Sequence, residues 1–541
     1  MGADRRKGQI ADYTAAFAQA PLRRHVLFSV FVAGMTTLAA EVAAFRLLGN
    51  IFGASNIVWA SIIGLILLYL SAGYFLGGRW ADRSPQRTTF FSIMAWGALT
   101  TGLIPFFSRP VLLQAARALA AVNAPVVGGA FLGTMLLFMA PVTLLGCLSP
   151  FAIRLLITEA STSGTVSGRV YSLSTVGSLL GSFLPVLVFI PWVGTRLTYL
   201  IFAALLLAVA LTGLWRTDSR RALNHMWMPA ALLALGAWAA SGNLRPVSGL
   251  LFERESPYNL IQVVERNSTH YLLLNEGQGV HSIYHPERLD TAGTWDYYLT
   301  APFFNAPPVS PSQVKNLAII GLAAGTISRQ YSAAFGDIPI TGIEIDADII
   351  AAGRRYFGMR QPNLRVIQAD GRLALANLPD HFSVIAVDAY RLPYIPWHLT
   401  TREFFGEART HLHERGALAI NVGRTPTDRR LVEALTATLL TAFPSVHVMD
   451  VPDTFNTILV ATVQPSTSEN LAANLENLPD AAPSLLRVAL QRGRASLRPT
   501  RAAGPVFSDD RAPVEQMTNS ILLRFLLAGS DARFPDSALG S

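Results

Sequence analysis

The first 245 residues consist of long apolar runs separated by short loops that contain arginine. A helix needs about 20 mostly apolar residues to cross the hydrocarbon core of a bilayer. Seven segments meet or approach that length: 25–49, 56–78, 88–108, 126–148, 170–193, 197–215 and 226–241. The pattern therefore predicts a helical membrane domain with about seven spans.

The pattern changes at about residue 251. Apolar and polar residues alternate along 259–277, which predicts two strands around a turn at Asn267 and Ser268. Farther along the chain, short aliphatic runs alternate with helical stretches. These runs are 317–320, 340–345, 364–369, 383–389 and 417–422. Strands that are buried on both faces and separated by helices are typical of a parallel, doubly wound sheet.

Together these patterns predict three parts. Residues 1–245 form a polytopic α-helical membrane domain, and residues 246–310 form a small β-rich subdomain. Residues 311–541 form an α/β Rossmann-like domain with a C-terminal extension.

The charge distribution agrees with a membrane half followed by a soluble half. Charged residues make up 14% of the 541 residues, against about 25% in an average soluble domain. Residues 1–245 contain 18 Lys and Arg but six Asp and Glu, whereas the remainder contains 25 and 29. Basic loops of a membrane protein explain this excess better than nucleic-acid binding does, and no basic patch is interleaved with aromatic residues. The single Cys147 excludes a disulfide framework and a multi-cysteine metal site, so no metal is expected.

The arginines also predict an orientation. Arg79, Arg83 and Arg87 follow the second span, and further arginines follow the fourth and sixth. Because basic loops stay on the cytoplasmic side, the N-terminus is expected in the cytoplasm. Seven spans would place the second half outside. The side of the membrane on which the second half lies stays open, however, because an extra crossing at 111–122 would reverse this orientation.

Small and acidic residues follow the predicted strands of the second half. A glycine loop, GLAAGT, comes after the first of these strands, and acids come after the next three. In a doubly wound sheet, ligands bind beyond the carboxyl ends of the strands, where an acid typically takes ribose hydroxyls. The combination predicts a nucleoside pocket. Its residues are Gly321, Gly325, Glu344, Asp346, Asp370, Gly371 and Asp388.

The order GLAAGT, GIEID, QADGR and VIAVDAY resembles an S-adenosylmethionine-type Rossmann domain, and within that class a spermidine synthase. SPYNLIQVVE (256–265), IPWHLTTREFF (395–405) and the pair Tyr297 and Tyr298 fit the same family. The whole chain resembles bacterial membrane-fused spermidine synthase-like proteins, and FSDDRAPVE (507–515) is similar to their C-terminal signature. The resemblance implies a multi-pass protein of the bacterial inner membrane.

The resemblance also implies roles for individual residues. Glu344 would bind ribose hydroxyls, Asp370 would lie by the adenine, and Asp388 would lie by the reacting amine. Two positions depart from the family pattern. Ala324 stands where the family has an acid in the glycine loop, and Arg391 stands where it has its usual catalytic base. Arg391 either points to solvent or pairs with a donor carboxylate.

Other side chains are candidates for the acceptor side. His398 is a candidate replacement base, since its ordinary pKa suits proton transfer at neutral pH, and Tyr390 lies beside Asp388 in the sequence. The proposed substrate-binding residues are Tyr297, Tyr298, Arg391, Asp509 and Asp510. Packing by the tyrosines and helix capping by the two aspartates are equally open interpretations.

Three functions remain open. The first is a membrane-anchored transferase that moves an aminopropyl group from decarboxylated S-adenosylmethionine to a polyamine. The second uses S-adenosylmethionine itself for methyl or aminocarboxypropyl transfer. The third is a transporter or sensor with a nucleoside- or polyamine-binding domain, which Glu41 inside the first span favours. The expected partners are a small-molecule acceptor and the lipid bilayer, with no nucleic acid, and a homo-oligomer is left open.

Overall fold

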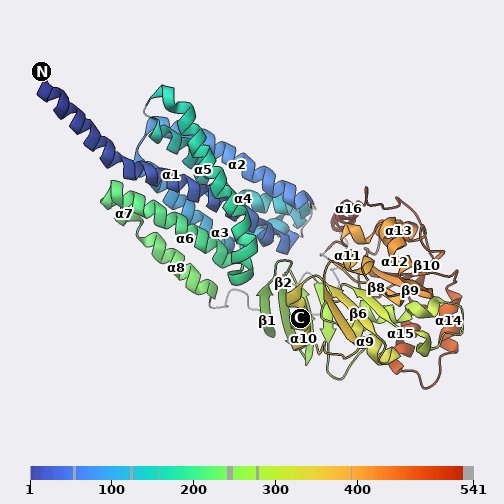
Figure 1. Ribbon diagram of the computed structural model, residues 1–541. Helices are drawn as coiled ribbons and strands as arrows, with labels where there is room; N and C mark the ends of the chain where they lie inside the picture. Colours follow the sequence, from blue (N-terminus) through green and yellow to red (C-terminus); the bar gives the residue numbers. More distant parts are fainter. Residues whose placement is uncertain are drawn as a thin grey trace. The chain divides into compact units, whose positions relative to one another are not determined.

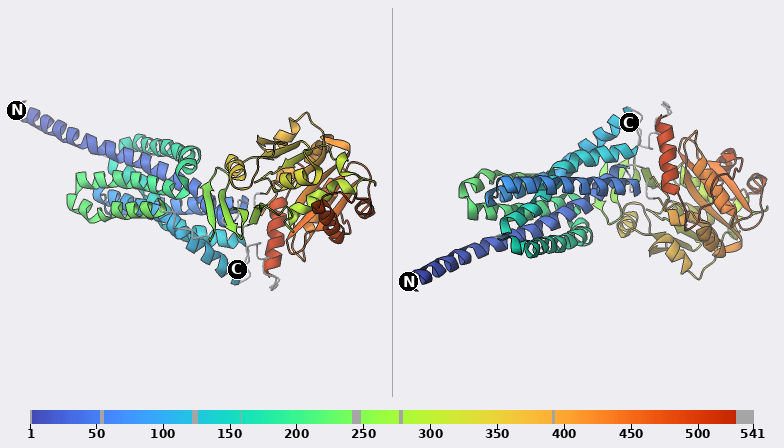
Figure 2. Two further views of the ribbon diagram at one scale, coloured as in Figure 1. Left: turned by 90° about the horizontal axis from the view of Figure 1, so that it is seen from below. Right: turned by 90° about the horizontal axis from the view of Figure 1, so that it is seen from above.

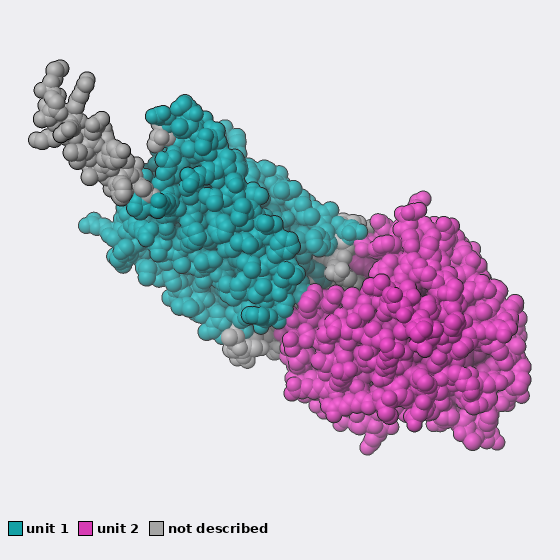
Figure 3. Space-filling view, in the orientation of Figure 1, with its two compact units in different colours: residues 1–246 teal, residues 247–541 magenta. Residues whose placement is uncertain are grey.

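The computed structural model describes residues 2–52, 56–121, 126–157, 159–240, 248–275, 279–390 and 393–527. The chain divides into two compact units, residues 1–246 and residues 247–541, shown in teal and magenta in Figure 3. Each unit has its own hydrophobic core. The further boundary near residue 311 stays a prediction.

Unit 1 is made of helices (Figure 1). They are α1 (Gly2–Phe52), α2 (Asn56–Arg83), α3 (Arg87–Ala121), α4 (Val126–Leu156), α5 (Ser163–Leu184), α6 (Ile190–Thr217), α7 (Ser219–His225) and α8 (Trp227–Ala240), with short turns η1 (Ala160–Thr162) and η2 (Pro185–Phe189) around α5. Because α3 continues without a break to Ala121, the stretch 111–121 is part of that helix and adds no separate crossing.

Five of these helical segments are long and apolar enough to span a membrane: Pro21–Gly49, Val58–Arg83, Arg87–Leu112, Gly128–Leu156 and Ala160–Thr217. The last contains 58 residues. A straight helix of that length would be about 87 Å long, nearly three times the hydrocarbon thickness. Gly194 interrupts it with φ 80° and ψ 168°, so the chain bends there and forms two helices.

Glycines allow the helices of unit 1 to touch. A Cβ atom added to Gly77 of α2 would lie 2.5 Å from the Cα of Cys147 in α4, and Gly73 faces the same helix. Gly177 and Gly181 of α5 lie against the backbone of α1 in the same way. The small-residue spacing of these two pairs therefore serves helix packing. Large apolar side chains such as Leu68 and Phe75 are exposed on the outside, as lipid contact requires.

Unit 2 begins with a small antiparallel sheet of four strands in the order β1-β2-β3-β4. These are β1 (Leu250–Glu255), β2 (Leu260–Arg266), β3 (Thr269–Leu274) and β4 (Gly279–Tyr284). Asn267 and Ser268 both have positive φ angles, 49° and 59°, which is the geometry of a tight two-residue hairpin. This is the turn that the sequence predicts.

The main sheet has eight strands in the order β12-β10-β11-β9-β8-β5-β6-β7. Their bounds are β5 (Leu317–Ile320), β6 (Ile340–Glu344), β7 (Leu364–Gln368), β8 (Phe382–Val387), β9 (Leu412–Gly423), β10 (Ser445–Asp450), β11 (Asn456–Thr462) and β12 (Leu497–Arg498). The α/β fold class is confirmed, and the five predicted strands, β5 to β9, pair in parallel. The sheet as a whole is mixed, because β10, β11 and β12, which were not predicted, pair antiparallel. β10 and β11 are joined by the short connection 451–455, which cannot make the long crossover that parallel neighbours need.

Helices and 3₁₀ segments cover both faces of this sheet (Figures 1 and 2). Alternate strand residues point to opposite sides: Leu317 and Ile319 belong to one core, and Ala318 and Ile320 to the other. The first core packs against η3 (Thr294–Phe304), α9 (Thr326–Phe335) and α15 (Ser484–Ala495), with α14 (Glu469–Glu476) and η4 (Pro311–Gln313) near it. The second packs against α12 (Arg402–Thr410), α13 (Arg430–Leu439), α11 (Gly371–Ala376) and α16 (Val514–Leu527). The structure also has α10 (Ala347–Tyr356) against the small sheet and η5 (Trp397–Leu399) before α12.

Candidate active site

The order of the strands fixes where a site can form. From β5 the chain adds β6 and β7 on one side, and then returns to place β8 and β9 on the other. The order of the strands therefore reverses between β5 and β8, and in doubly wound sheets the carboxyl ends of the two strands at such a reversal are where a ligand crevice forms. Gly321 directly follows β5, and Asp388 directly follows β8.

The glycine loop passes very close to the end of β8. Gly321 has a φ angle of 85°, and a Cβ atom there would lie 2.6 Å from the carbonyl oxygen of Asp388 and 2.7 Å from the nitrogen of Ala389. No other residue fits this position without moving the backbone. Gly325, with φ 90°, is the N-cap of α9. The glycine loop and the backbone at the end of β8 are thus in direct contact.

Glu344 anchors the other side of the loop. It ends β6 and is 8% exposed, and its carboxylate accepts the backbone N–H groups of Ala323 (2.9 Å) and Asp346 (3.0 Å). Burial raises the pKa of Glu344 to about 7, although the two N–H donors act in the opposite direction. An acid in this position is held ready to accept further hydroxyl groups, such as those of a ribose.

Asp346 is engaged within the protein. It is the N-cap of α10, where it accepts the N–H of Asp348, and its other oxygen accepts Ser256 and Asn259 from the loop between β1 and β2. Asp346 therefore joins the small sheet to the main domain. Its predicted role in cofactor binding stays a prediction. Gly371 is the first residue of α11, where a side chain would collide with Ile320 of β5.

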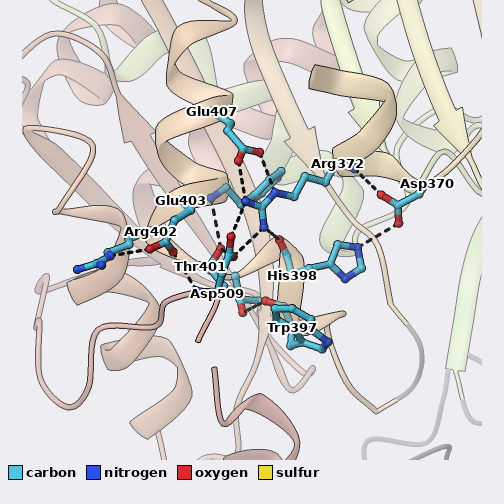
Figure 4. A network of polar contacts seen from close by, with 11 residues as sticks. Asp370, Arg372, Trp397, His398, Thr401, Arg402, Glu403, Glu407 and Asp509 are labelled. Carbon is cyan, nitrogen blue, oxygen red and sulfur yellow. Dashed lines mark hydrogen bonds and ion pairs between the residues drawn. The ribbon is translucent and has the colours of Figure 1, made fainter. Parts of the chain in front are cut away.

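Asp370 pairs with His398. One oxygen of Asp370 caps α11 by accepting the N–H groups of Arg372 and Leu373, each at 3.0 Å. The other accepts a hydrogen bond from Nε2 of His398 at 3.1 Å (Figure 4). Since a carboxylate only accepts, Nε2 of His398 has the proton. The predicted adenine-side acid and the predicted base thus lie together.

Asp388 lies in a separate cluster. Its carboxylate accepts Nε1–H of Trp295 and Nδ2–H of Asn421, each at 3.0 Å. Burial raises the pKa of Asp388, and these hydrogen bonds oppose that rise. The hydroxyl of Tyr390 donates to the backbone oxygen of Asn421 at 3.0 Å. Asp388 and Tyr390 therefore share Asn421 as a neighbour, as candidates for one reaction centre should.

The structure differs from the expected acceptor side at several residues. The ring of His398 bonds Asp370, and within the described part of the chain it makes no hydrogen bond to Asp388. Tyr297 and Tyr298 are 2% and 0% exposed, and their hydroxyls bond Ser496 and the backbone of Val387, because the aromatic rings complete the core beneath the sheet. The hydroxyl of Tyr298 also lies next to the carboxylate of Asp388, where it helps to lower the pKa of that group. The predicted roles of both tyrosines in substrate binding stay predictions.

The remaining predicted substrate-binding residues lie in different places. Asp509 forms an ion pair with Arg372, whereas Asp510 is exposed to solvent. Arg391 lies outside the described residues. Ala324 is 1% exposed and belongs to the apolar cluster between the small sheet and α10, so its Cβ faces aliphatic groups. An acid at position 324 would be buried there without a partner.

Sequence reasoning missed Trp295, Asn421 and Arg372. Asn421 is the one polar residue in the apolar strand sequence ALAINV, and a lone polar residue at a strand end is a signal that could have identified it. Trp295 and Arg372 show no such signal, since their partners are far away in the sequence. Within the described residues, no group of three or more His, Cys, Asp or Glu side chains could hold a metal ion.

Comparisons with known proteins identify aminopropyltransferases as relatives of this chain. No family model matches the chain. It is 31% identical over 250 residues to a probable polyamine aminopropyl transferase of Bifidobacterium longum, a match that covers 44% of this chain and 54% of that protein. It is 27% identical over 214 residues to a polyamine aminopropyltransferase of Vibrio vulnificus, covering 38% of this chain and 69% of the other. In these comparisons the chain is spermidine synthase-like, that is, similar in sequence to polyamine aminopropyltransferases.

The solved structures that align with the chain include spermidine synthases. A probable spermidine synthase from Corynebacterium glutamicum aligns with a TM-score of 0.38 and 19% identity, over 49% of this spermidine synthase-like chain and 99% of the other. The chain spans about half the length of the Bifidobacterium relative. The shared name therefore does not by itself assign the substrates.

Glu344 gives a pH-dependent test of the site. A carboxyl whose pKa is raised by folding contributes stability below its ordinary value near 4.5, and that contribution is lost as the pH rises to about 7. The stability of Glu344→Gln relative to wild type should therefore increase as the pH rises across this interval, by up to about 3 kcal/mol of unfolding free energy. The melting temperature of the variant should rise relative to that of wild type in the same direction. Thermal melts of the ligand-free protein between pH 4.5 and 8 measure it. The exposed Glu476→Gln is the control, and a difference that does not change with pH would contradict the buried, protonatable Glu344.

Proposed function

We propose that the protein transfers an aminopropyl group from decarboxylated S-adenosylmethionine to a polyamine. The observation that supports this most is the position of Asp388, a partly buried carboxylate at the carboxyl end of β8, next to the glycine loop that follows β5. The similarity to polyamine aminopropyltransferases supports the same reaction class. The comparisons give no support to methyl or aminocarboxypropyl transfer, or to a transporter or sensor.

The reaction needs little from the protein beyond position and one proton acceptor. The nitrogen of the acceptor amine forms a bond to the donor methylene carbon next to sulfur. The carbon–sulfur bond breaks, its electron pair stays on sulfur, and methylthioadenosine leaves. The new ammonium loses a proton. We assign this proton transfer and the orientation of the amine to Asp388, whose raised pKa makes it a better base than an ordinary aspartate.

Asn421 completes the acceptor side in this proposal. It is 7% exposed, its Nδ2 donates to Asp388, and its Oδ1 has no hydrogen-bond partner within the described residues. The carboxylate can only accept, so the amide must present Nδ2 to it and turn Oδ1 elsewhere. A buried acceptor without a partner is costly. The N–H of an amine would satisfy it while its lone pair faces the donor carbon.

Donor recognition in this proposal falls on the residues at the ends of β5, β6 and β7. Glu344 would accept the ribose hydroxyls, and Gly321 and Gly325 let the loop approach the nucleoside. Asp370, with His398 bound to it, would lie beside the adenine.

We also propose a multi-pass protein of the bacterial inner membrane with the N-terminus in the cytoplasm. Helix α8 runs along α3: Trp227 lies 6.1 Å from Trp96, and Trp238 lies 5.6 Å from Phe106, measured between ring centroids. Helix α8 therefore leads away from the arginine-rich end where α3 begins. The proposed count takes α1 to α4, the two helices on either side of Gly194, and α8, which is not among the five long segments but lies along α3. Seven crossings would place unit 2 outside.

A reporter test decides this orientation. Alkaline phosphatase folds to an active enzyme outside the cytoplasm, so a fusion after residue 541 should be active. The same reporter fused after Arg221, on the arginine-rich side, should be inactive and serves as the matched control. Activity of the Arg221 fusion alone would reverse the assignment and place unit 2 in the cytoplasm.

Turnover tests the reaction. The full-length protein in lipid nanodiscs should release methylthioadenosine from decarboxylated S-adenosylmethionine only when a polyamine such as putrescine is present. Asp388→Asn should lower kcat about 10²- to 10⁴-fold, the usual contribution of a positioned base. The exposed Asp380→Asn is the control and should match wild type. Release of methylthioadenosine without an acceptor, or full activity of Asp388→Asn, would contradict the proposed function.

A further inference from the structure

Arg372 lies at the centre of a polar network on the donor side of the crevice (Figure 4). It comes two residues after Asp370, in the first turn of α11, and its side chain is 17% exposed. Its guanidinium forms a fork with Glu407 of α12, with distances of 2.7 Å and 2.6 Å. A second fork reaches Asp509, with distances of 2.8 Å and 2.9 Å. Few single side chains bind two carboxylates in this way, and arginine has the geometry for it.

The second fork ties the C-terminal segment to the site. Ser508 and Arg511 form a bridge, so that Asp509 lies at the tip of a tight turn. Asp509 also accepts the hydroxyl of Thr401 at 2.7 Å and donates its backbone N–H to Glu403 at 3.0 Å. The turn is therefore fixed on the N-terminal end of α12. The arginine lowers the pKa of Asp509, which keeps its carboxylate charged.

The same guanidinium also holds His398. Nη1 of Arg372 donates to the backbone oxygen of His398 at 3.1 Å, while the imidazole of His398 donates to Asp370 at 3.1 Å. The backbone and the ring of His398 are thus each fixed, one by Arg372 and the other by Asp370. Arg372 in turn donates its own N–H to Asp370. Loss of the guanidinium would leave two carboxylates facing each other and release the backbone of His398.

We propose that Arg372 is a positioning residue, which sets the Asp370–His398 pair for the adenosyl donor and makes donor binding depend on Asp509 in the C-terminal turn. The ligand in this statement rests on the proposed function. Arg372 acts through His398 and does not itself need to touch the donor.

The chain offers a matched control. Arg430 forms a fork with Asp428 at 2.9 Å and 2.7 Å and donates to Ser520 of α16, so it too ties a C-terminal helix to the main domain. Within the described part of unit 2, its side-chain hydrogen bonds reach Asp428 and Ser520 and no residue at the ends of β5 to β8. Arg430→Gln should reproduce the structural cost of a lost fork without moving the donor side.

The binding experiment uses the full-length protein in nanodiscs and methylthioadenosine as the probe, followed by calorimetry. Arg372→Gln should weaken binding about tenfold or more, and Asp509→Asn should weaken it in the same direction. Arg430→Gln should stay within about twofold of wild type. In addition, Arg372→Gln combined with His398→Ala should bind no more weakly than His398→Ala alone, because the first residue acts through the second.

Hydrogen exchange tests the positioning without any ligand. Arg372→Gln should speed exchange in peptides that cover 371–376 and 395–400, and Arg430→Gln should leave them unchanged. The inference is overturned if Arg372→Gln leaves affinity within twofold, if Arg430→Gln weakens binding equally, or if the two losses add in the double variant. Should wild type bind no methylthioadenosine, the proposed function fails, and unchanged exchange in Arg372→Gln would then also refute the positioning role.

Discussion

The close approach between the loop after β5 and the end of β8 is the constraint on which the site depends. The backbone of Gly321 lies so near Asp388 and Ala389 that a single added carbon would collide with both. This contact brings the glycine loop, which the proposed function assigns to the donor, next to the strand end that contains Asp388. It is possible only because position 321 has no side chain and tolerates a positive φ angle.

Around this contact the polar residues form two groups with different partners. On the donor side, Glu344, Asp370 and His398 are held by backbone N–H groups and by the network of Arg372. On the acceptor side, Asp388 is held by Trp295 and Asn421. Burial disfavours the charged forms of both Glu344 and Asp388, so the protein gives up some stability to keep two carboxylates at the crevice. Such an arrangement is expected where charge is needed for binding or proton transfer.

The sequence predicts the parts of the fold that depend on local pattern. Strands buried on both faces appear as short aliphatic runs, and β5 to β9 lie where those runs predict them. The direction of β10 and β11 could not be read in this way, because an aliphatic strand has the same pattern in either direction. The length of the connection 451–455 decides it.

The same limit applies to the candidate site. Glu344, Asp370 and Asp388 could be identified because each directly follows a strand. Their partners could not, since Trp295 is 93 residues from Asp388 and Asp509 is 137 residues from Arg372. His398 illustrates the consequence: it is ten residues from Asp388 in the sequence, but its ring binds Asp370.

The central claim is that unit 2 binds an adenosyl thioether at the ends of β5, β6 and β7. A cryo-electron microscopy structure of the full-length protein with methylthioadenosine tests it most directly. The account predicts the ribose hydroxyls within hydrogen-bond distance of Glu344 and the adenine beside Asp370, with the sulfur facing Asp388. A nucleoside bound elsewhere, or a ribose that does not contact Glu344, would contradict it.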